Sequence, residues 1–146
     1  MNDRSGYALA LALVFAPASA GAAELLGPAR VIDGQTIEVE GQRVRLYGIA
    51  APALGSECDV AGKRIACGQI SRSALMDLTA GAIVECRQVG GVGGAAVCRA
   101  GGYCLSEGMT YTGWARADTT VTDRYVHYEA DARRRHRGLW RRARDD

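Results

Sequence analysis

Apolar and polar residues alternate along the chain after residue 28, with the period of two that is typical of β-strands. Three runs show this pattern, over residues 29–33, 36–39 and 42–49. Turn residues separate the runs, at Gly34 and at residues 40–41. The pattern therefore predicts a three-stranded meander near the start of the folded part of the chain.

The period changes over residues 68–80, where Ile70, Ala74 and Leu78 recur every four residues. This spacing places the three side chains on one face of a helix, and Gly81 supplies a C-terminal stop. We predict two further helices, over about residues 105–114 and about 124–137, with a loop rich in Thr and Asp between them. The chain shows no internal repeat and no interdomain linker.

A glycine-rich tip at residues 90–94 separates two further runs of strand character, 83–86 and 95–98. Such an arrangement predicts a hairpin. If the hairpin is centred on Val92, Cys86 and Cys98 lie directly opposite each other. Opposite residues bring their side chains close enough for a disulfide bridge.

Five cysteines in an exported chain suggest two disulfides and one remaining thiol. Cys58 and Cys67 bracket a short loop, residues 59–66. They form the second natural disulfide pair, in addition to Cys86–Cys98. Cys104 is then free. A zinc site is the competing interpretation, but no two cysteines have C-x₂-C spacing, and we expect no metal there.

The first 22 residues resemble a secretory signal peptide. Arg4 is a weak n-region charge, residues 7–16 form an apolar run, and small residues at 18–20 predict cleavage near residues 20–23. Ten apolar residues are too few for a membrane span, which needs roughly 20. We expect a secreted or periplasmic protein with no membrane anchor after cleavage; an uncleaved anchor or a misplaced start is the alternative.

The expected organisation is a signal peptide over residues 1–22, one domain over 24–140, and a basic tail over 141–146. The net charge is +2, but seven arginines against four acids lie from Glu129 to the end. The rest of the domain is close to neutral, which is not typical of a globally basic nucleic-acid binder. The basic end is either a solvated helix with i,i+4 ion pairs or a polyanion-binding surface.

Two segments together carry a family resemblance: Val-Ile-Asp-Gly-Gln-Thr-Ile at residues 31–37 and Arg-Leu-Tyr-Gly-Ile-Ala-Ala-Pro-Ala at 45–53. They resemble the staphylococcal nuclease family, whose motifs read Asp-Gly-Asp-Thr, then Arg, four residues and Asp-Thr-Pro-Glu. Residues 113–115 and 129–140 resemble the closing helices of that family. The resemblance implies a five-stranded OB-fold barrel of the staphylococcal nuclease type plus three helices, an α+β fold.

The family cleaves phosphodiesters with one Ca²⁺ held by carboxylates, a glutamate proposed to handle the attacking water, and two arginines that clamp the phosphate. Ca²⁺ needs several oxygen ligands, and the water needs a base within hydrogen-bond reach. The resemblance implies that most of these groups are absent here. Asp33 is retained from the metal site and Arg45 from the clamp, whereas the other positions hold Gln35, Ala50, Ala53 and Gly94.

Arg45 alternates with core positions of its strand, so we expect it to face the groove together with Arg43 and Tyr47. A surface ion pair with a nearby carboxylate is the alternative role for Arg45. Four tyrosines could stack nucleic-acid bases, although residues at such spacing are more often half-buried core. They are Tyr103, Tyr111, Tyr125 and Tyr128.

Two functions follow from this pattern. The first is a monomeric binding or interaction module without catalysis or cofactor, whose partner is single-stranded nucleic acid, another polyanion or a protein. The second is a phosphodiesterase, an endonuclease with a rearranged site that is either Ca²⁺-dependent or metal-independent. Losing a general base costs about 10² to 10⁴ in rate and losing an arginine clamp about 10³ to 10⁵, which favours the first function.

Overall fold

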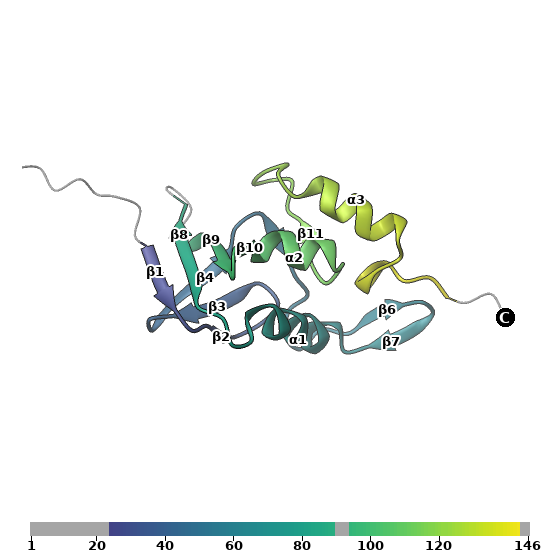
Figure 1. Ribbon diagram of the computed structural model, residues 1–146. Coiled ribbons are helices and arrows are strands. Elements are labelled where there is room, and N and C mark those ends of the chain that lie inside the picture. Colours follow the sequence, from purple (N-terminus) through teal and green to yellow (C-terminus); the bar gives the residue numbers. More distant parts are fainter. Residues whose placement is uncertain (1–23, 90–93, 144–146) are drawn as a thin grey trace, which may run out of the picture.

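The computed structural model describes residues 24–89 and 94–143 (Figure 1). The expected leader, the hairpin centre at Val92 and Arg144 of the basic tail lie outside these residues. The described chain is a mixed α+β structure with a mostly antiparallel sheet and three α-helices. Among the helices described, none has both the length and the apolar character to cross a membrane.

The main sheet contains the expected meander, and a parallel pair joins it to the expected hairpin. The strands run in the order β1-β8-β9-β4-β3-β2, with β10 added beside β9, and every pair except β4–β9 is antiparallel. These strands are β1 (Glu24–Gly27), β2 (Arg30–Val31), β3 (Thr36–Val39), β4 (Gln42–Leu46), β8 (Val84–Gln88), β9 (Ala95–Ala100) and β10 (Tyr103–Cys104).

The alternation of apolar and polar residues correctly predicted which side chains are buried. Ile37 and Val39 of β3 are fully buried. In β4, Val44 and Leu46 are at most 3% exposed, whereas Arg45 between them is exposed. Burial of four such aliphatic side chains stabilises the fold by about 1.5–3 kcal/mol each. The inner face of the sheet is therefore the core, and its outer face carries the charged residues.

The prediction of a third strand over residues 42–49 is wrong in its last part, because β4 ends at Leu46. Gly48 turns the chain with a φ of +77°, and a Cβ atom there would lie 2.6 Å from a ring carbon of Tyr125. The chain resumes as β5 (Ile49–Ala50), which pairs with β11 (Arg116–Ala117) in a separate two-stranded sheet. Period-two patterning alone does not show such a break, since the alternation continues across it.

The loop expected over residues 59–66 is a hairpin. It consists of β6 (Cys58–Val60) and β7 (Lys63–Ile65), joined by a turn in which Ala61 and Gly62 have φ angles of +53° and +73°. Two positive φ angles are typical of a type I′ hairpin turn, for which Asn-Gly is the usual signal. Ala-Gly is a weak signal for this turn, so the sequence did not indicate the hairpin.

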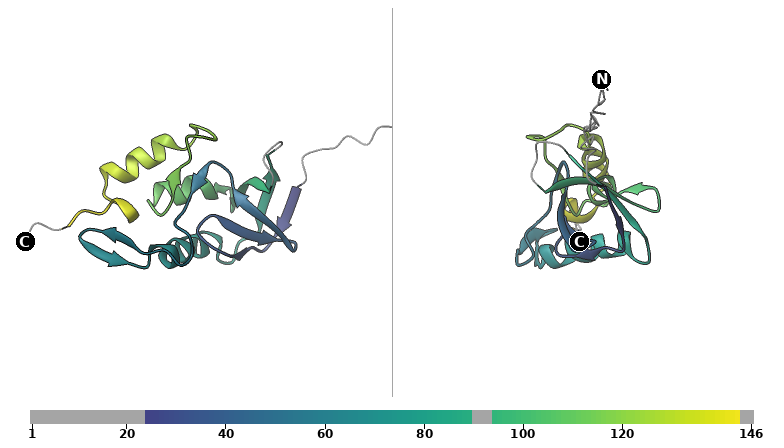
Figure 2. Two further views of the ribbon diagram at one scale, coloured as in Figure 1. Left: turned by 180° about the vertical axis from the view of Figure 1, so that it is seen from behind. Right: turned by 90° about the vertical axis from the view of Figure 1, so that its left-hand side faces the viewer.

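The helices are α1 (Cys67–Thr79), α2 (Leu105–Tyr111) and α3 (Val126–Arg134), followed by a short 3₁₀-helix η1 (Gly138–Trp140). The expected existence and order of the three helices are correct, but α2 and α3 are shorter than predicted. Helix α2 contacts α1, α3 and β9, so it lies at the centre of the molecule. Figure 2 shows α3 and the β6–β7 hairpin at the end opposite β1.

Two disulfides are present, Cys86–Cys98 across the β8–β9 pair and Cys58–Cys67 between the hairpin and α1. Cys86 and Cys98 are directly paired in the strand register and fully buried. The thiol of Cys104 is free and buried, with its sulfur 3.8 Å from the hydroxyl oxygen of Tyr125. Burial, together with this neighbour, raises the pKa of Tyr125 to about 12.

The arginine-rich end of α3 is organised around Asp131. Its carboxylate accepts hydrogen bonds from Arg137 at 2.9 Å and Arg135 at 3.2 Å, and it also pairs with Arg134. Glu129 binds Arg133 in the same way. These arginines are thus paired with acids of their own helix, as the solvated-helix interpretation expected.

Acid should weaken the fold partly through Asp131. Burial pushes the pKa of Asp131 upward, but hydrogen bonds from Arg135 and Arg137 outweigh it and lower the pKa below its ordinary 3.8. A lowered pKa contributes stability above the ordinary value that is lost as pH falls through the folded value. We therefore expect urea unfolding of Asp131→Asn to depend less on pH below about 4 than that of the wild type. Equal pH dependence would contradict this role.

Candidate functional site

The two clamp positions implied by the family resemblance, Arg45 and Gly94, lie side by side. They come together because β4 and β9 are parallel neighbours, and the backbone N–H of Arg45 donates to the carbonyl of Gly94 with an N–O distance of 2.7 Å. Gly94 has a φ of +70°, and a Cβ atom there would meet no atom of the described residues within 4 Å. With respect to residues 24–89 and 94–143 the position is open, so a longer side chain would have room beside Arg45.

The Arg45 guanidinium has no ion-pair partner within 4.0 Å among the described residues. The alternative role, a surface ion pair, is therefore not seen in this part of the chain. Arg43, two residues earlier on the same face, lies 3.9 Å from Glu38. Glu38 is held more closely by Arg30, whose hydrogen bond lowers the pKa of Glu38. Arg43 and Arg45 together leave positive charge on this face.

Asp33 and Gln35 of the retained loop each accept a hydrogen bond within the fold. Asp33 accepts the backbone N–H of Gln35 at 2.9 Å, and the side-chain oxygen of Gln35 accepts the backbone N–H of Ala51 at 2.6 Å. Gln35 thus ties the loop to the segment after β5. These bonds are of the kind that fixes turns and loop ends, and they require no metal.

Close packing fixes the same loop against α1. A Cβ atom on Gly34 would lie 1.9 Å from the hydroxyl oxygen of Ser71 and 2.9 Å from Cβ of Ala51. The Ser71 hydroxyl is fully buried and donates to the carbonyl of Trp114 at 2.8 Å. Only glycine fits between these elements, so the Asp-Gly-Gln loop keeps a defined position.

Ala50 and Ala53 bring no side-chain oxygen to the site. Ala50 is paired with Arg116 across the β5–β11 ladder, and Ala53 is exposed, with its carbonyl accepting the backbone N–H of Ser56 at 2.8 Å. Residues 24–89 and 94–143 contain no group of three or more His, Cys, Asp or Glu side chains suited to hold a metal.

Tyr47 closes one side of the Arg45 face. Its hydroxyl donates to the carbonyl of Val121 at 3.3 Å, and its own carbonyl accepts the hydroxyl of Ser106 at 2.8 Å. Arg45, Tyr47, Val121 and Asp118 line a shallow hollow of about 80 Å³. We call this face, with Arg43, the Arg45 groove. Asp118 and Val121 were missed by sequence reasoning, which predicted only a loop there.

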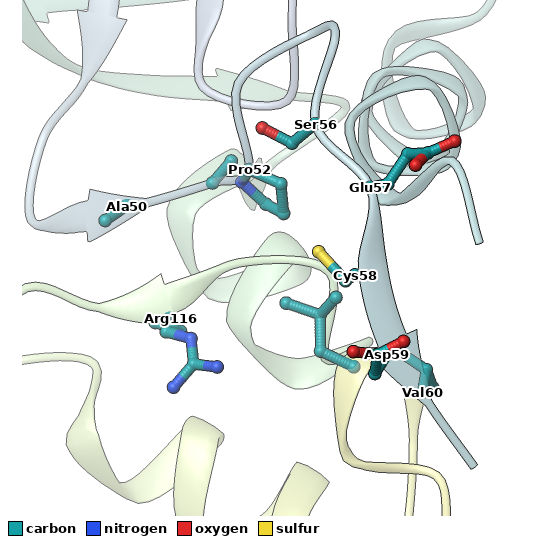
Figure 3. Close-up of a pocket in the computed structure, with 10 residues that line it drawn as sticks. Ala50, Pro52, Ser56, Glu57, Cys58, Asp59, Val60 and Arg116 are labelled. Atoms are coloured by element: carbon teal, nitrogen blue, oxygen red, sulfur yellow. The ribbon is translucent and has the colours of Figure 1, made fainter. Parts of the chain in front are cut away.

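A larger pocket lies beyond Ala50 and was not predicted. It holds about 370 Å³ and is lined by residues of β5, β6, β11 and η1. Figure 3 shows Arg116 on one side, Asp59 on the other and Ser56 near one end. The Arg116 guanidinium lies over the Trp140 ring, 4.6 Å from its centroid. We call it the hairpin pocket, because the β6–β7 hairpin forms one wall.

No protein-family model matches the chain. Over 67 residues it is 46% identical to the succinoglycan biosynthesis protein ExoI of Rhizobium meliloti (strain 1021). The match covers 44% of this chain and 35% of that protein, so the chain spans about a third of the length of this relative. The similarity is partial, and it does not assign a family to the chain.

Proposed function

We propose that this chain is a secreted or periplasmic domain of the staphylococcal nuclease type that has lost catalysis and binds a polyanion through the Arg45 groove. The observation that carries the proposal is an Arg45 without an ion-pair partner among the described residues, together with a loop in which Asp33 and Gln35 each already accept a backbone N–H. Such a site retains a means to hold an anion. It lacks most of the carboxylates that would bind Ca²⁺ and activate water, since Asp33 alone is retained.

The strand order supports the barrel part of this proposal. Strands β1 and β2 stand at the two ends of the sheet order, yet only Pro28 and Ala29 separate them along the chain. Counted as one bent strand, they pair with β8 on one side and β3 on the other. Counted in this way, the order is consistent with the five-stranded ring that we propose, that of an OB-fold, a fold that commonly binds oligonucleotides or oligosaccharides.

Ion pairing favours the Arg45 groove over helix α3 and its end as the anion-binding surface. Four arginines of α3 and its end are paired with Glu129 or Asp131. An anionic polymer would have to break those pairs, whereas Arg45 needs none broken. The similar protein is named for succinoglycan biosynthesis, so polymers other than nucleic acid belong among the ligands to be tested.

Replacing Arg45 should weaken polyanion binding. We expect Arg45→Gln to raise the Kd for a fluorescently labelled single-stranded oligonucleotide by about tenfold at low salt, because a charge-assisted hydrogen bond contributes about 1.5–3 kcal/mol. The dependence of log Kd on log salt should also become shallower, by about 0.7 for one lost contact to a single strand. Fluorescence anisotropy over a salt series measures both changes.

Arg99→Gln is the matched control, since it removes the same charge from the exposed face of β9. A similar loss in both variants would indicate general electrostatics and would contradict a specific groove. A second series with an anionic polysaccharide in place of the oligonucleotide shows which polymer class binds more tightly. Binding of neither polymer by the wild type would overturn the proposal.

A further inference from the structure

We propose that the hairpin pocket binds a small polyol that carries one oxyanion, as in a sugar acid or a sugar phosphate. The pocket volume of about 370 Å³ lies within the range of small-molecule sites. The pocket shares no lining residue with the hollow beside Arg45. This inference therefore stands independently of polyanion binding.

Arg116 supplies the anion-binding group. Its guanidinium stacks on Trp140 and has neither a hydrogen bond nor an ion pair with any other described residue. The ring of Trp140 is also approached by Arg133, at 3.9 Å, but Arg133 donates to Glu129 and is thereby neutralised. Arg116 keeps its planar set of N–H donors free, and such a fork matches the two oxygens of a carboxylate or phosphate.

The opposite wall favours hydroxyl groups on the rest of the ligand. Asp59 and Glu57 offer acceptor oxygens, and both pair with Arg64, at 3.7 Å and 3.0 Å. Arg64 offsets one of their two negative charges, which lowers their preference for an ammonium group. The carboxylates can then accept hydrogen bonds from neutral hydroxyls. They would still repel a second anion. Ser56 lines the same pocket with a hydroxyl that can donate or accept.

The pocket is held in shape before any ligand arrives. The Cys58–Cys67 bridge fixes the hairpin to the start of α1, and Val60 of the hairpin is buried. Stacking on Trp140 likewise positions Arg116. Such fixed walls reduce the ordering cost of binding a small ligand.

The residue opposite Arg116 decides whether its charge is free. Ala50 and Arg116 are direct partners in the strand register, and both line the pocket. Directly opposite side chains on paired strands lie close enough for oppositely charged groups to interact. An acidic side chain at position 50 would therefore occupy Arg116, whereas alanine leaves it available to a ligand.

The test is an NMR titration of ¹⁵N-labelled protein with four probes, each at millimolar concentration. D-Glucuronate and glucose 1-phosphate carry the proposed chemistry with a carboxylate or a phosphate, D-glucose lacks the oxyanion, and glycine replaces the hydroxyls by an ammonium group. We expect saturable amide shifts at Ala50, Ser56 and Asp59 with one or both sugar anions. Comparison of those two shows which oxyanion is preferred.

Two variants should weaken binding of the sugar anion by different routes. Arg116→Gln removes the guanidinium, and Ala50→Asp leaves it in place but neutralises it, so each should raise the Kd for the sugar anion at least about tenfold. Arg99→Gln should leave that Kd unchanged. Spectral dispersion shows whether each variant is folded, and Ala50→Asp keeps the test valid if loss of the Trp140 stack unfolds Arg116→Gln.

Three results would overturn the inference. Glucose binding as tightly as glucuronate would show that no oxyanion is recognised, and glycine binding in place of the sugars would identify an ammonium site. An absence of shifts with all four probes would show that the pocket binds no ligand of this class. None of these results bears on the Arg45 groove, so failure here is distinct from failure of the proposed function.

Discussion

Replacing Cys86 and Cys98 together with alanine should lower the free energy of unfolding by about 3 kcal/mol, because the bridge closes a loop with a sequence separation of 12. Both cysteines are fully buried, so the lost sulfur contacts add to the loss of the crosslink. A domain of this size has a small margin of stability, and a change of this magnitude removes a large part of it. Urea unfolding followed by circular dichroism measures the difference.

Cys104→Ala is the control for the buried sulfur alone. Cys104 is 3% exposed and unbridged, so its replacement should cost only about 1 kcal/mol. The double variant Cys58→Ala/Cys67→Ala is the comparison for the other bridge, which closes a loop with a sequence separation of 9 at the edge of the molecule. A similar small cost for Cys86/Cys98 and for Cys104 would show that the sheet alone, without its bridge, supplies the stability of this region.

The Cys86–Cys98 pair also shows why part of this fold is predictable. A hairpin with a glycine-rich tip has a simple symmetry, so two residues equally far from the tip must face each other. In contrast, β1 and the β6–β7 hairpin went unpredicted. The sequence of β1 does not alternate, because its outward position holds the exposed Leu26, and the Ala61-Gly62 turn lacks the residues that usually mark a type I′ turn. β1 also pairs with the distant strand β8, and local patterns do not report such a partner.

The candidate site was likewise predictable only in part. The family resemblance implied that Arg45 and Gly94 belong to one site, and the parallel β4–β9 pair brings them together. The roles of Gln35 and Gly34 could not be predicted, because they depend on Ala51 and Ser71 from other elements. Arg116 carried no signal at all: only tertiary structure places it over Trp140 and opposite Ala50.

The purified protein should show no Ca²⁺-dependent cleavage of DNA or RNA, and Ca²⁺ should not raise its Tm. An ion that binds only the folded state stabilises it by mass action, by about 2.7 kcal/mol at a hundredfold excess over Kd. The melting curve is therefore a direct measure of metal binding that does not rely on activity. Robust Ca²⁺-dependent turnover that disappears in Arg45→Ala would contradict the proposal of a non-catalytic domain.

Restoring the family pattern should create a Ca²⁺ response that the wild type lacks. The restored variant carries three acids and the second clamp arginine: Gln35→Asp, Ala50→Asp, Ala53→Glu and Gly94→Arg. The structure predicts two costs. Aspartate at position 35 is too short to keep the bond to Ala51, and a φ of +70° at position 94 costs an arginine about 1–2 kcal/mol.

Arg116 adds a third obstacle, because the new carboxylate at position 50 would lie directly opposite its guanidinium. We expect the restored variant to gain a larger Ca²⁺-dependent rise in Tm when Arg116→Gln is added, since the carboxylate is then free to bind the ion. The matched control carries asparagine at positions 35 and 50 and glutamine at 53, which keep the size of the side chains without their charge. A Ca²⁺-dependent rise in Tm in that amide control would show that the ion binds elsewhere on the molecule.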